Sequence, residues 1–263
     1  MEVRLFPNSL RPGTGLKPRR ESQRPFLPQH ARHCPVLEAG SALGFLVYPP
    51  LEQIESFHVG YQGDGRYQLT YFLNTPPAQG VTIFSMTMQL PMGSIGMVNQ
   101  KITFMNEQHP IPLETALALV RALIVPEDLG TPAGGITLRG ATNFQTPQGW
   151  DTVYCPVLNL IERPHVPMLV IRVETDWYPH ETEFRYVLQP GEGINCVHNL
   201  PIGQVFFVPR EEITVRDCTE EEIAAIRRAR EEFFREKANL TQTTGYGIQY
   251  SPHYLRQSRS QKT

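Results

Sequence analysis

The sequence predicts a mainly β protein, built as a distorted barrel or a sandwich, with one internal helix and one C-terminal helix. Three observations favour this class. Proline supplies 24 of the 263 residues, about double its average share, which favours turns and strands over long helices. Short apolar runs recur between clusters of Pro, Gly and Asn, as in barrels and sandwiches. Helix-type patterns stand out in two segments.

The chain is expected to begin with an arm and to continue as a β-rich body. Residues 1–32 are predicted to form an extended, solvated Pro/Arg-rich arm, because proline recurs every few residues and apolar periodicity is missing. The body is predicted over residues 33–210. The strands expected in it cover residues 44–48, 54–61, 67–73, 81–90, 95–104, 136–139, 152–156, 168–173, 183–188 and 204–208. Gly-Asp-Gly at residues 63–65 indicates a hairpin between the second and third of these strands.

Two helices are predicted. The internal helix covers residues 113–125, where helix formers are dense and Pro126 ends the pattern. It is apolar nearly all round, which indicates a packed core element. The C-terminal helix is expected within residues 211–239 and begins at a capping box of Thr219 and Glu222. We expect its apolar stripe to dock on the β body or on a neighbouring subunit.

Charge is unevenly distributed although the net charge is only −2. Residues 1–30 hold six Lys/Arg against two Glu, and residues 240–263, predicted to be a flexible basic tail, hold three and no acid. By subtraction, residues 31–239 carry fifteen bases and twenty-four acids. Lys101 and Lys237 are the only lysines in this acidic part, so we expect no nucleic acid to bind the core.

Several classes of site and location are disfavoured. The four cysteines lie far apart without a Cys-x-x-Cys pair, so neither a zinc site nor a disulfide framework is predicted. The lipase-type Gly-x-Ser-x-Gly, the P-loop, Gly-x-Gly-x-x-Gly and His-Glu-x-x-His are absent. No apolar window reaches the roughly 18 to 20 residues of a membrane span, and residues 1–30 contain no signal-peptide run. We therefore expect a cytoplasmic protein without membrane contacts.

Two acidic residues beside an aromatic one are the main candidates for chemistry. Glu174 and Asp176 are two apart, so on a strand both carboxylates would lie on one face. Paired carboxylates can position a water or raise the pKa of one partner, and Trp177 could stack on a planar substrate. The alternative is a solvated strand face with Trp177 in the core behind it, which is the commoner arrangement in antiparallel sheets.

Three segments resemble a bacterial domain family of unknown function. They are Cys-Pro with a following Ala-x-Gly-Phe, starting at Cys34, Thr-Pro-Gln-Gly-Trp at residues 146–150, and Glu-Thr-Asp-Trp-Tyr-Pro at residues 174–179. The resemblance spans residues 34–210. Its later part, residues 133–210, is also similar in layout to the β-clip of trimeric dUTPases and dCTP deaminases.

The resemblance to dUTPases implies roles for individual residues. Glu174 takes the place of the water-orienting aspartate, Trp177 lies at or beside the position of the sugar-stacking tyrosine, and Gln204 corresponds to the closing glutamine. Trp150 and Tyr178 complete the candidate ligand-binding set. The same resemblance implies a homo-oligomer, specifically a trimer.

The chain departs from dUTPases at the expected phosphate-binding Arg-Ser-Gly segment, because residues 155–160 have Cys-Pro-Val-Leu-Asn-Leu there. A triphosphate would meet an acidic body without a basic cradle. We therefore expect a non-enzymatic homo-oligomer that binds a small ligand or a partner. Two alternatives stay open. One is a nucleotide-processing or other hydrolytic enzyme that uses Glu174 and Asp176, with Mg²⁺ as cofactor only in the nucleotide case. The other is a structural assembly subunit with exchanged terminal arms.

Overall fold

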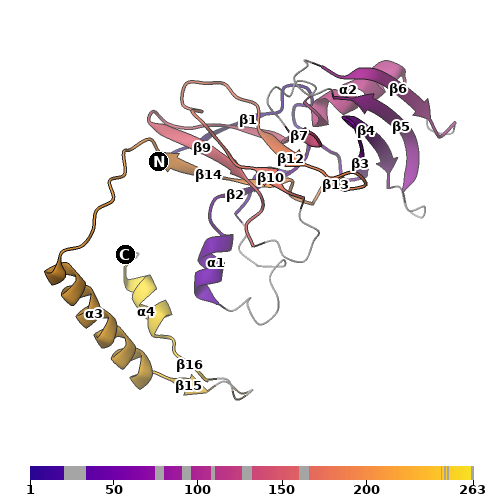
Figure 1. Cartoon of the computed structure of the whole chain (residues 1–263). Helices are drawn as coiled ribbons and strands as arrows, with labels where there is room; N and C mark the ends of the chain where they lie inside the picture. The colour runs from indigo at the N-terminus through magenta and orange to yellow at the C-terminus, as the bar shows by residue number, and fades with distance from the viewer. Residues whose placement is uncertain are drawn as a thin grey trace. The chain divides into compact units, whose positions relative to one another are not determined.

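A computed structural model describes residues 1–20, 34–74, 80–90, 96–107, 110–125, 132–159, 166–243, 245, 247 and 249–261 of the chain. The chain divides into two compact units, Met1–Arg210 and Glu211–Thr263, which are described separately (Figure 1). Strands dominate over helices in the described residues, which confirms the predicted mainly β class.

Unit 1 contains almost all of the strands. They are β1 (Arg4–Pro7), β2 (Phe45–Val47), β3 (Glu55–Gly63), β4 (Arg66–Leu73), β5 (Val81–Gln89), β6 (Val98–Phe104), β7 (Gly135–Arg139), β8 (Thr142–Gln145), β9 (Trp150–Cys155), β10 (Met168–Leu169), β11 (Ile171–Val173), β12 (Glu183–Val187), β13 (Gly193–Val197) and β14 (Gly203–Pro209). Its helices are α1 (Pro35–Ser41), which the sequence analysis did not predict, and α2 (Leu113–Leu123).

The strands of unit 1 form open sheets. Their orders are β1-β8, β10-β12-β7, β11-β9-β14-β2 and β13-β3-β4-β5-β6. Since no sheet among the described residues closes on itself, the predicted barrel is not found. Closure needs long edge strands with continuous pairing, whereas β10 and β11 are only two and three residues long.

The β3–β4 hairpin confirms the turn predicted from Gly-Asp-Gly. Asp64 and Gly65 both have positive φ, 51° and 70°, which matches the right-handed twist of the flanking strands. Along β3 buried residues alternate with less buried ones, so one face of the five-stranded sheet lies on the core.

One cluster of buried side chains joins the five-stranded sheet to α2, β7 and β12 and extends to β9 and β14. Tyr71 is central to it, with ring centroids 5.0 Å from Phe57 and 5.3 Å from Phe84. The helix α2 contributes Val120 and Leu123, both fully or almost fully buried, as its apolar sequence predicts. In Figure 1 this sheet and α2 lie to the right of the unit, and β9 and β14 lie to the left. The strands that carry the candidate site therefore rest on the same core.

Most side chains of residues 1–20 are exposed, as in the predicted arm, but the segment is attached to the body at specific points. β1 pairs with β8 in antiparallel register. Asn8 is fully buried, and its Nδ2 donates to the backbone carbonyls of Ala122 (3.3 Å) and Gly140 (3.0 Å). Val3 and Leu16 add apolar contacts with the core clusters. These apolar residues are too few and too far apart to form a periodic pattern in the sequence. The rest of the predicted arm, residues 21–32, lies outside the described residues.

An ion pair fixes this segment to the five-stranded sheet. Arg11 Nη1 and Nη2 donate to the two carboxylate oxygens of Glu55 at 2.8 and 3.1 Å, and the Glu55 side chain is only 8% exposed. The hydroxyl of Tyr71 and the backbone N–H of Glu52 also donate to this carboxylate. Burial opposes ionisation, but the hydrogen bonds, chiefly that from Arg11, outweigh it and hold the pKa of Glu55 below its usual value.

Unit 2 contains α3 (Glu220–Asn239), β15 (Gln242–Thr243), β16 (Gln249–Tyr250) and α4 (His253–Ser260). The predicted capping box of α3 forms, with Thr219 and Glu222 exchanging hydrogen bonds. The helix begins at Glu220, so residues 211–219 of the predicted segment are not helical. The predicted tail is partly ordered, because β15 pairs with β16 and the buried His253 ring packs 4.7 Å from that of Phe233.

None of the helices in the described part of the chain combines the length and the apolar character needed to cross a lipid bilayer.

Replacing Arg11 by alanine is expected to lower the free energy of unfolding by about 3 kcal/mol, because the variant leaves the Glu55 carboxylate buried without its cation. Urea unfolding measures the difference. Arg66→Ala is the matched control, since Arg66 pairs with Asp64 in solvent at the hairpin tip, and we expect it to change stability by less than about 0.5 kcal/mol. Equal effects of the two substitutions would contradict the anchoring role of Arg11.

Candidate functional site

The two motifs at residues 146–150 and 174–178 meet in space. The first forms a turn closed by hydrogen bonds from Thr146 Oγ1 to the Trp150 carbonyl (2.6 Å) and from the Trp150 N–H to the Pro147 carbonyl (3.1 Å). Gly149 has φ +78°, which disfavours any residue with a Cβ. Its N–H donates to Asp176 Oδ2 at 2.9 Å, so the first turn holds the second.

Residues 174–178 form a tight turn and not the strand that the sequence analysis predicts. β11 ends at Val173, and the Tyr178 N–H donates to the Glu174 carbonyl at 3.0 Å. The cause is Thr175, whose buried hydroxyl hydrogen bonds with those of Thr146 (2.9 Å) and Thr152 (2.7 Å). Because the Thr175 side chain is buried by these hydrogen bonds, the chain turns here, and the alternating side-chain directions of a strand do not continue through residues 174–176.

A network of charges lies beneath the turn. Asp151 is buried on β9 and accepts from Arg172 Nε at 2.6 Å and from Arg210 Nε and Nη2 at 2.9 and 2.6 Å. Arg210 Nη2 also donates to Asp176 at 2.7 Å, and the Arg210 N–H donates to the Gly149 carbonyl. Arg210 therefore connects both turns to the buried carboxylate of Asp151.

The network keeps both aspartates ionised. Burial opposes the charge on Asp151, but hydrogen bonds from Arg210 and Arg172 outweigh it and hold its pKa below the usual value. For Asp176, the hydrogen bonds from Arg210 and from the Gly149 N–H lower the pKa. Both carboxylates are thereby committed to structural partners.

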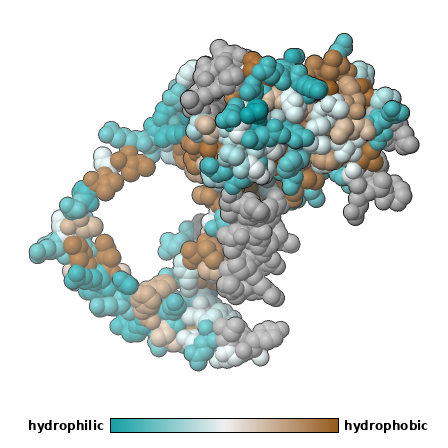
Figure 2. Space-filling model, turned by 45° about the vertical axis from the view of Figure 1, so that its right-hand side comes forward, coloured by the Kyte–Doolittle hydropathy of each residue, from teal (hydrophilic) through white to brown (hydrophobic). Residues whose placement is uncertain are grey.

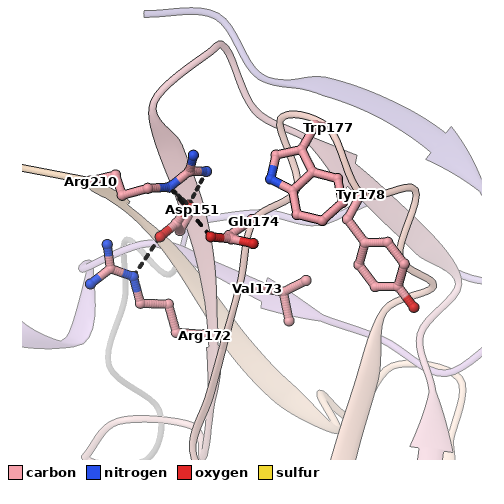
Figure 3. Close-up of a pocket in the computed structure, with 7 residues that line it drawn as sticks. All are labelled: Asp151, Arg172, Val173, Glu174, Trp177, Tyr178 and Arg210. Atoms are coloured by element: carbon pink, nitrogen blue, oxygen red, sulfur yellow. Dashed lines mark hydrogen bonds and ion pairs between the residues drawn. The ribbon is translucent and has the colours of Figure 1, made fainter.

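An open pocket of about 490 Å³ lies over this network (Figure 3). Its lining consists of Asp151, Arg172, Val173, Glu174, Trp177, Tyr178 and Arg210. We call it the aromatic-lined pocket. Trp177 is 65% exposed and Tyr178 is 49% exposed, with ring centroids 5.8 Å apart. The alternative that placed Trp177 in the core is therefore wrong, because Thr175 and Asp176 take the inward positions of the turn and Trp177 is left outside.

The predicted carboxylate pair is divided between two environments. The Glu174 side chain is 49% exposed and lines the pocket, with Oε1 3.9 Å from Arg210 Nε, beyond hydrogen-bonding distance. The Asp176 side chain is 6% exposed and does not line the pocket. Glu174 is the carboxylate with free bonding capacity toward a ligand.

The imidazole of His180 supports the pocket from the side of Tyr178. The two rings stack with centroids 5.7 Å apart and an interplanar angle of 21°. Burial, aided by the charge of Arg185, lowers the pKa of His180 to about 4. The ring is therefore neutral near pH 7, and Tyr178 rests on an uncharged surface.

Two predicted ligand-binding residues lie elsewhere. Gln204 is buried on β14, where its Oε1 accepts from the Leu158 N–H at 3.0 Å and its Nε2 donates to the Leu43 carbonyl. Trp150 begins β9, is half-buried and does not line the pocket. The amide of Gln204 therefore has an internal role, connecting β14 to two loops of unit 1.

The sequence analysis missed Asp151, Arg172 and Arg210. An acid within the apolar strand β9 was the available signal, because a buried carboxylate requires cationic partners. Nothing in the sequence indicates which arginines supply them. As for metals, the described residues contain no group of three or more His, Cys, Asp or Glu side chains able to hold an ion.

Comparison with known proteins gives no relative: no protein-family model, curated protein or solved structure matches the chain. Function is therefore inferred from the geometry of the pocket itself.

Replacing Asp151 by asparagine is expected to destabilise unit 1 by about 2 kcal/mol at pH 7, because two guanidinium groups lose their shared partner. The folded pKa of Asp151 lies below the unfolded value of about 3.9. Its stabilisation is thus fully present above about pH 4 and disappears as the pH falls through the folded pKa. Urea unfolding between pH 7 and pH 3 measures the difference in free energy of unfolding between the wild type and Asp151→Asn. This difference should be constant down to about pH 5 and then shrink.

Asp64→Asn, at an exposed turn, is the control and should be nearly neutral throughout. A wild-type advantage over Asp151→Asn that grows on acidification would contradict the role assigned to the carboxylate.

Proposed function

We propose that the chain is a binding protein whose site is the aromatic-lined pocket. One observation carries the proposal: Trp177 and Tyr178 are exposed on a turn whose Thr175 and Asp176 side chains are held by hydrogen bonds within unit 1. Exposed aromatic side chains lose apolar contact with the protein but provide large, rigid contact areas for a ligand. Because the turn is already ordered, a ligand would meet little conformational cost on binding.

The hydrolytic alternative has less support. Asp176 is engaged by Arg210 and by the Gly149 N–H, which leaves Glu174 without a second carboxylate on the pocket side. General acid–base catalysis by a pair requires two titratable groups that face the substrate. A phosphate cradle would require cationic groups free to bind, and Arg210 already donates through Nε and Nη2 to the two aspartates.

We also propose kinship to the bacterial domain family over residues 34–210 and to the dUTPase-like β-clip over residues 133–210. Support comes from the order of elements along the chain. The turn before β9, the acidic turn after β11 and the closing strand β14 follow one another in the same order as in a β-clip. A small-ligand pocket beside the acidic turn agrees with that layout.

The proposed function is tested with a fragment library observed through the two indole N–H resonances of the protein. Bound fragments should shift the Trp177 resonance and leave that of Trp150 unchanged. Trp177→Ala should abolish binding while the free energy of unfolding changes by less than about 1 kcal/mol, because the side chain is mostly exposed. Tyr254→Ala, an exposed aromatic of unit 2, is the control and should retain binding. Fragments that bind Trp177→Ala equally well would place the site elsewhere.

We further propose a homo-oligomer in which α3 packs on the same helix of a second copy. No residue of α3 is buried within its unit, and Ile223, Ile226 and Phe234 are exposed along one side. Apolar residues are visible on the surface of unit 2 in Figure 2. Identical helices provide matching apolar stripes that can pack together around a symmetry axis. The resemblance to dUTPases implies a trimer as the particular state.

Light scattering of the purified protein at micromolar concentration is expected to give a multiple of the chain mass. Ile226→Asp should shift the mass toward one chain, because it places a charge in the apolar stripe. Arg228→Asp lies on the opposite side of α3 and should leave the mass unchanged. A wild-type protein of one chain mass would refute the oligomer.

A further inference from the structure

Within the proposed binding function, we infer that the aromatic-lined pocket selects an organic cation, a guanidinium or alkylammonium group. The inference rests on the charges that remain after the internal pairs are formed. Five charged side chains belong to the pocket and its supporting network: two guanidinium groups and three carboxylates. The sum is an excess of one negative charge.

The excess charge is located on Glu174. Asp151 accepts three N–H bonds from the two arginines, and Asp176 accepts one from Arg210 and one from the Gly149 N–H. Glu174 has no guanidinium within hydrogen-bonding distance, since its nearest cationic nitrogen is 3.9 Å away. Its carboxylate can therefore accept from an incoming donor without breaking an existing bond.

The aromatic rings reinforce the preference for a cation. In Figure 3 the Glu174 carboxylate lies between the charge network on one side and the rings of Trp177 and Tyr178 on the other. The face of an aromatic ring attracts a positive charge, and indole does so most strongly. A guanidinium or ammonium group in the pocket would contact an aromatic face and a carboxylate together.

An anionic ligand fits the same pocket poorly. Arg172 uses Nε for Asp151, and its Nη2 lies 3.4 Å from the Pro209 carbonyl. The Nε and Nη2 groups of Arg210 donate to the two aspartates. An anion near Trp177 would face the charge of Glu174, whose nearest cationic nitrogen, Arg210 Nε at 3.9 Å, is shared with Asp151.

The test uses the full chain carrying Trp150→Phe, so that fluorescence reports Trp177 alone. Three probes are titrated: the capped amino acid Nα-acetyl-arginine amide, its neutral isostere Nα-acetyl-citrulline amide, and the anion benzoate. The arginine probe should bind at least tenfold more tightly than the citrulline probe. Glu174→Gln should remove that tenfold preference, whereas Glu114→Gln, an exposed acid on α2 outside the pocket, should retain it. If Trp150→Phe fails to fold, the indole N–H resonance of Trp177 in the wild-type protein provides the readout.

The outcomes separate the inference from the proposed function. Equal affinity for arginine and citrulline probes, or preference for benzoate, would overturn the cation inference and leave the binding pocket intact. No binding of any probe, together with a silent fragment screen, would overturn both. A Gly/Ser decapeptide with one central arginine distinguishes the sources of the cation. If the peptide binds much more tightly than the capped arginine probe, the natural ligand is an arginine side chain of a protein partner. If the two bind equally, the natural ligand is a free small molecule. Both results support the inference.

Discussion

The buried carboxylate of Asp151 is the constraint on which the candidate site depends. An ionised acid inside a β-sheet is stable only with cationic partners, and here they come from β11 and from the residue that follows β14. Those partners fix the ends of both strands. Arg210 then extends the same network to Asp176 and to the backbone of Gly149. One desolvated charge thus determines where three separate chain segments meet.

The position of the aromatic side chains follows from this arrangement. Thr175 and Asp176 point inward because a hydroxyl cluster and a guanidinium provide their partners. In a turn this tight, neighbouring residues cannot all share one direction, so Trp177 and Tyr178 project into solvent. Exposure of these two aromatic side chains is unfavourable for the isolated unit. Turning them inward would displace Thr175 and Asp176 and leave the Asp176 carboxylate without its partners. Exposed apolar surface is here a consequence of satisfying buried polar groups.

Local patterns were sufficient to predict α2 and most of the longer strands, because alternation and helix propensity are properties of neighbouring residues. They did not predict β1, β8 or β13. The failures involve partners that are distant in the sequence. The burial of Asn8 depends on carbonyls more than a hundred residues away. The strand predicted through Glu174 fails because Thr175 finds hydroxyls on β9 and on the preceding turn. In each case a specific hydrogen bond overrides a local preference, and only the three-dimensional structure identifies the donor and the acceptor.

The same reasoning explains why binding is better supported than catalysis. A carboxylate that acts as a general acid or base must change its protonation state during the reaction, so its pKa has to lie near the working pH. Asp176 is held in the opposite condition, because its hydrogen bonds stabilise the ionised form and a proton would break the contact that orders the turn. A permanently charged aspartate serves as an anchor. Glu174 has no comparable structural role, so its charge is left for recognition, and a carboxylate beside two aromatic rings is complementary to a positive charge.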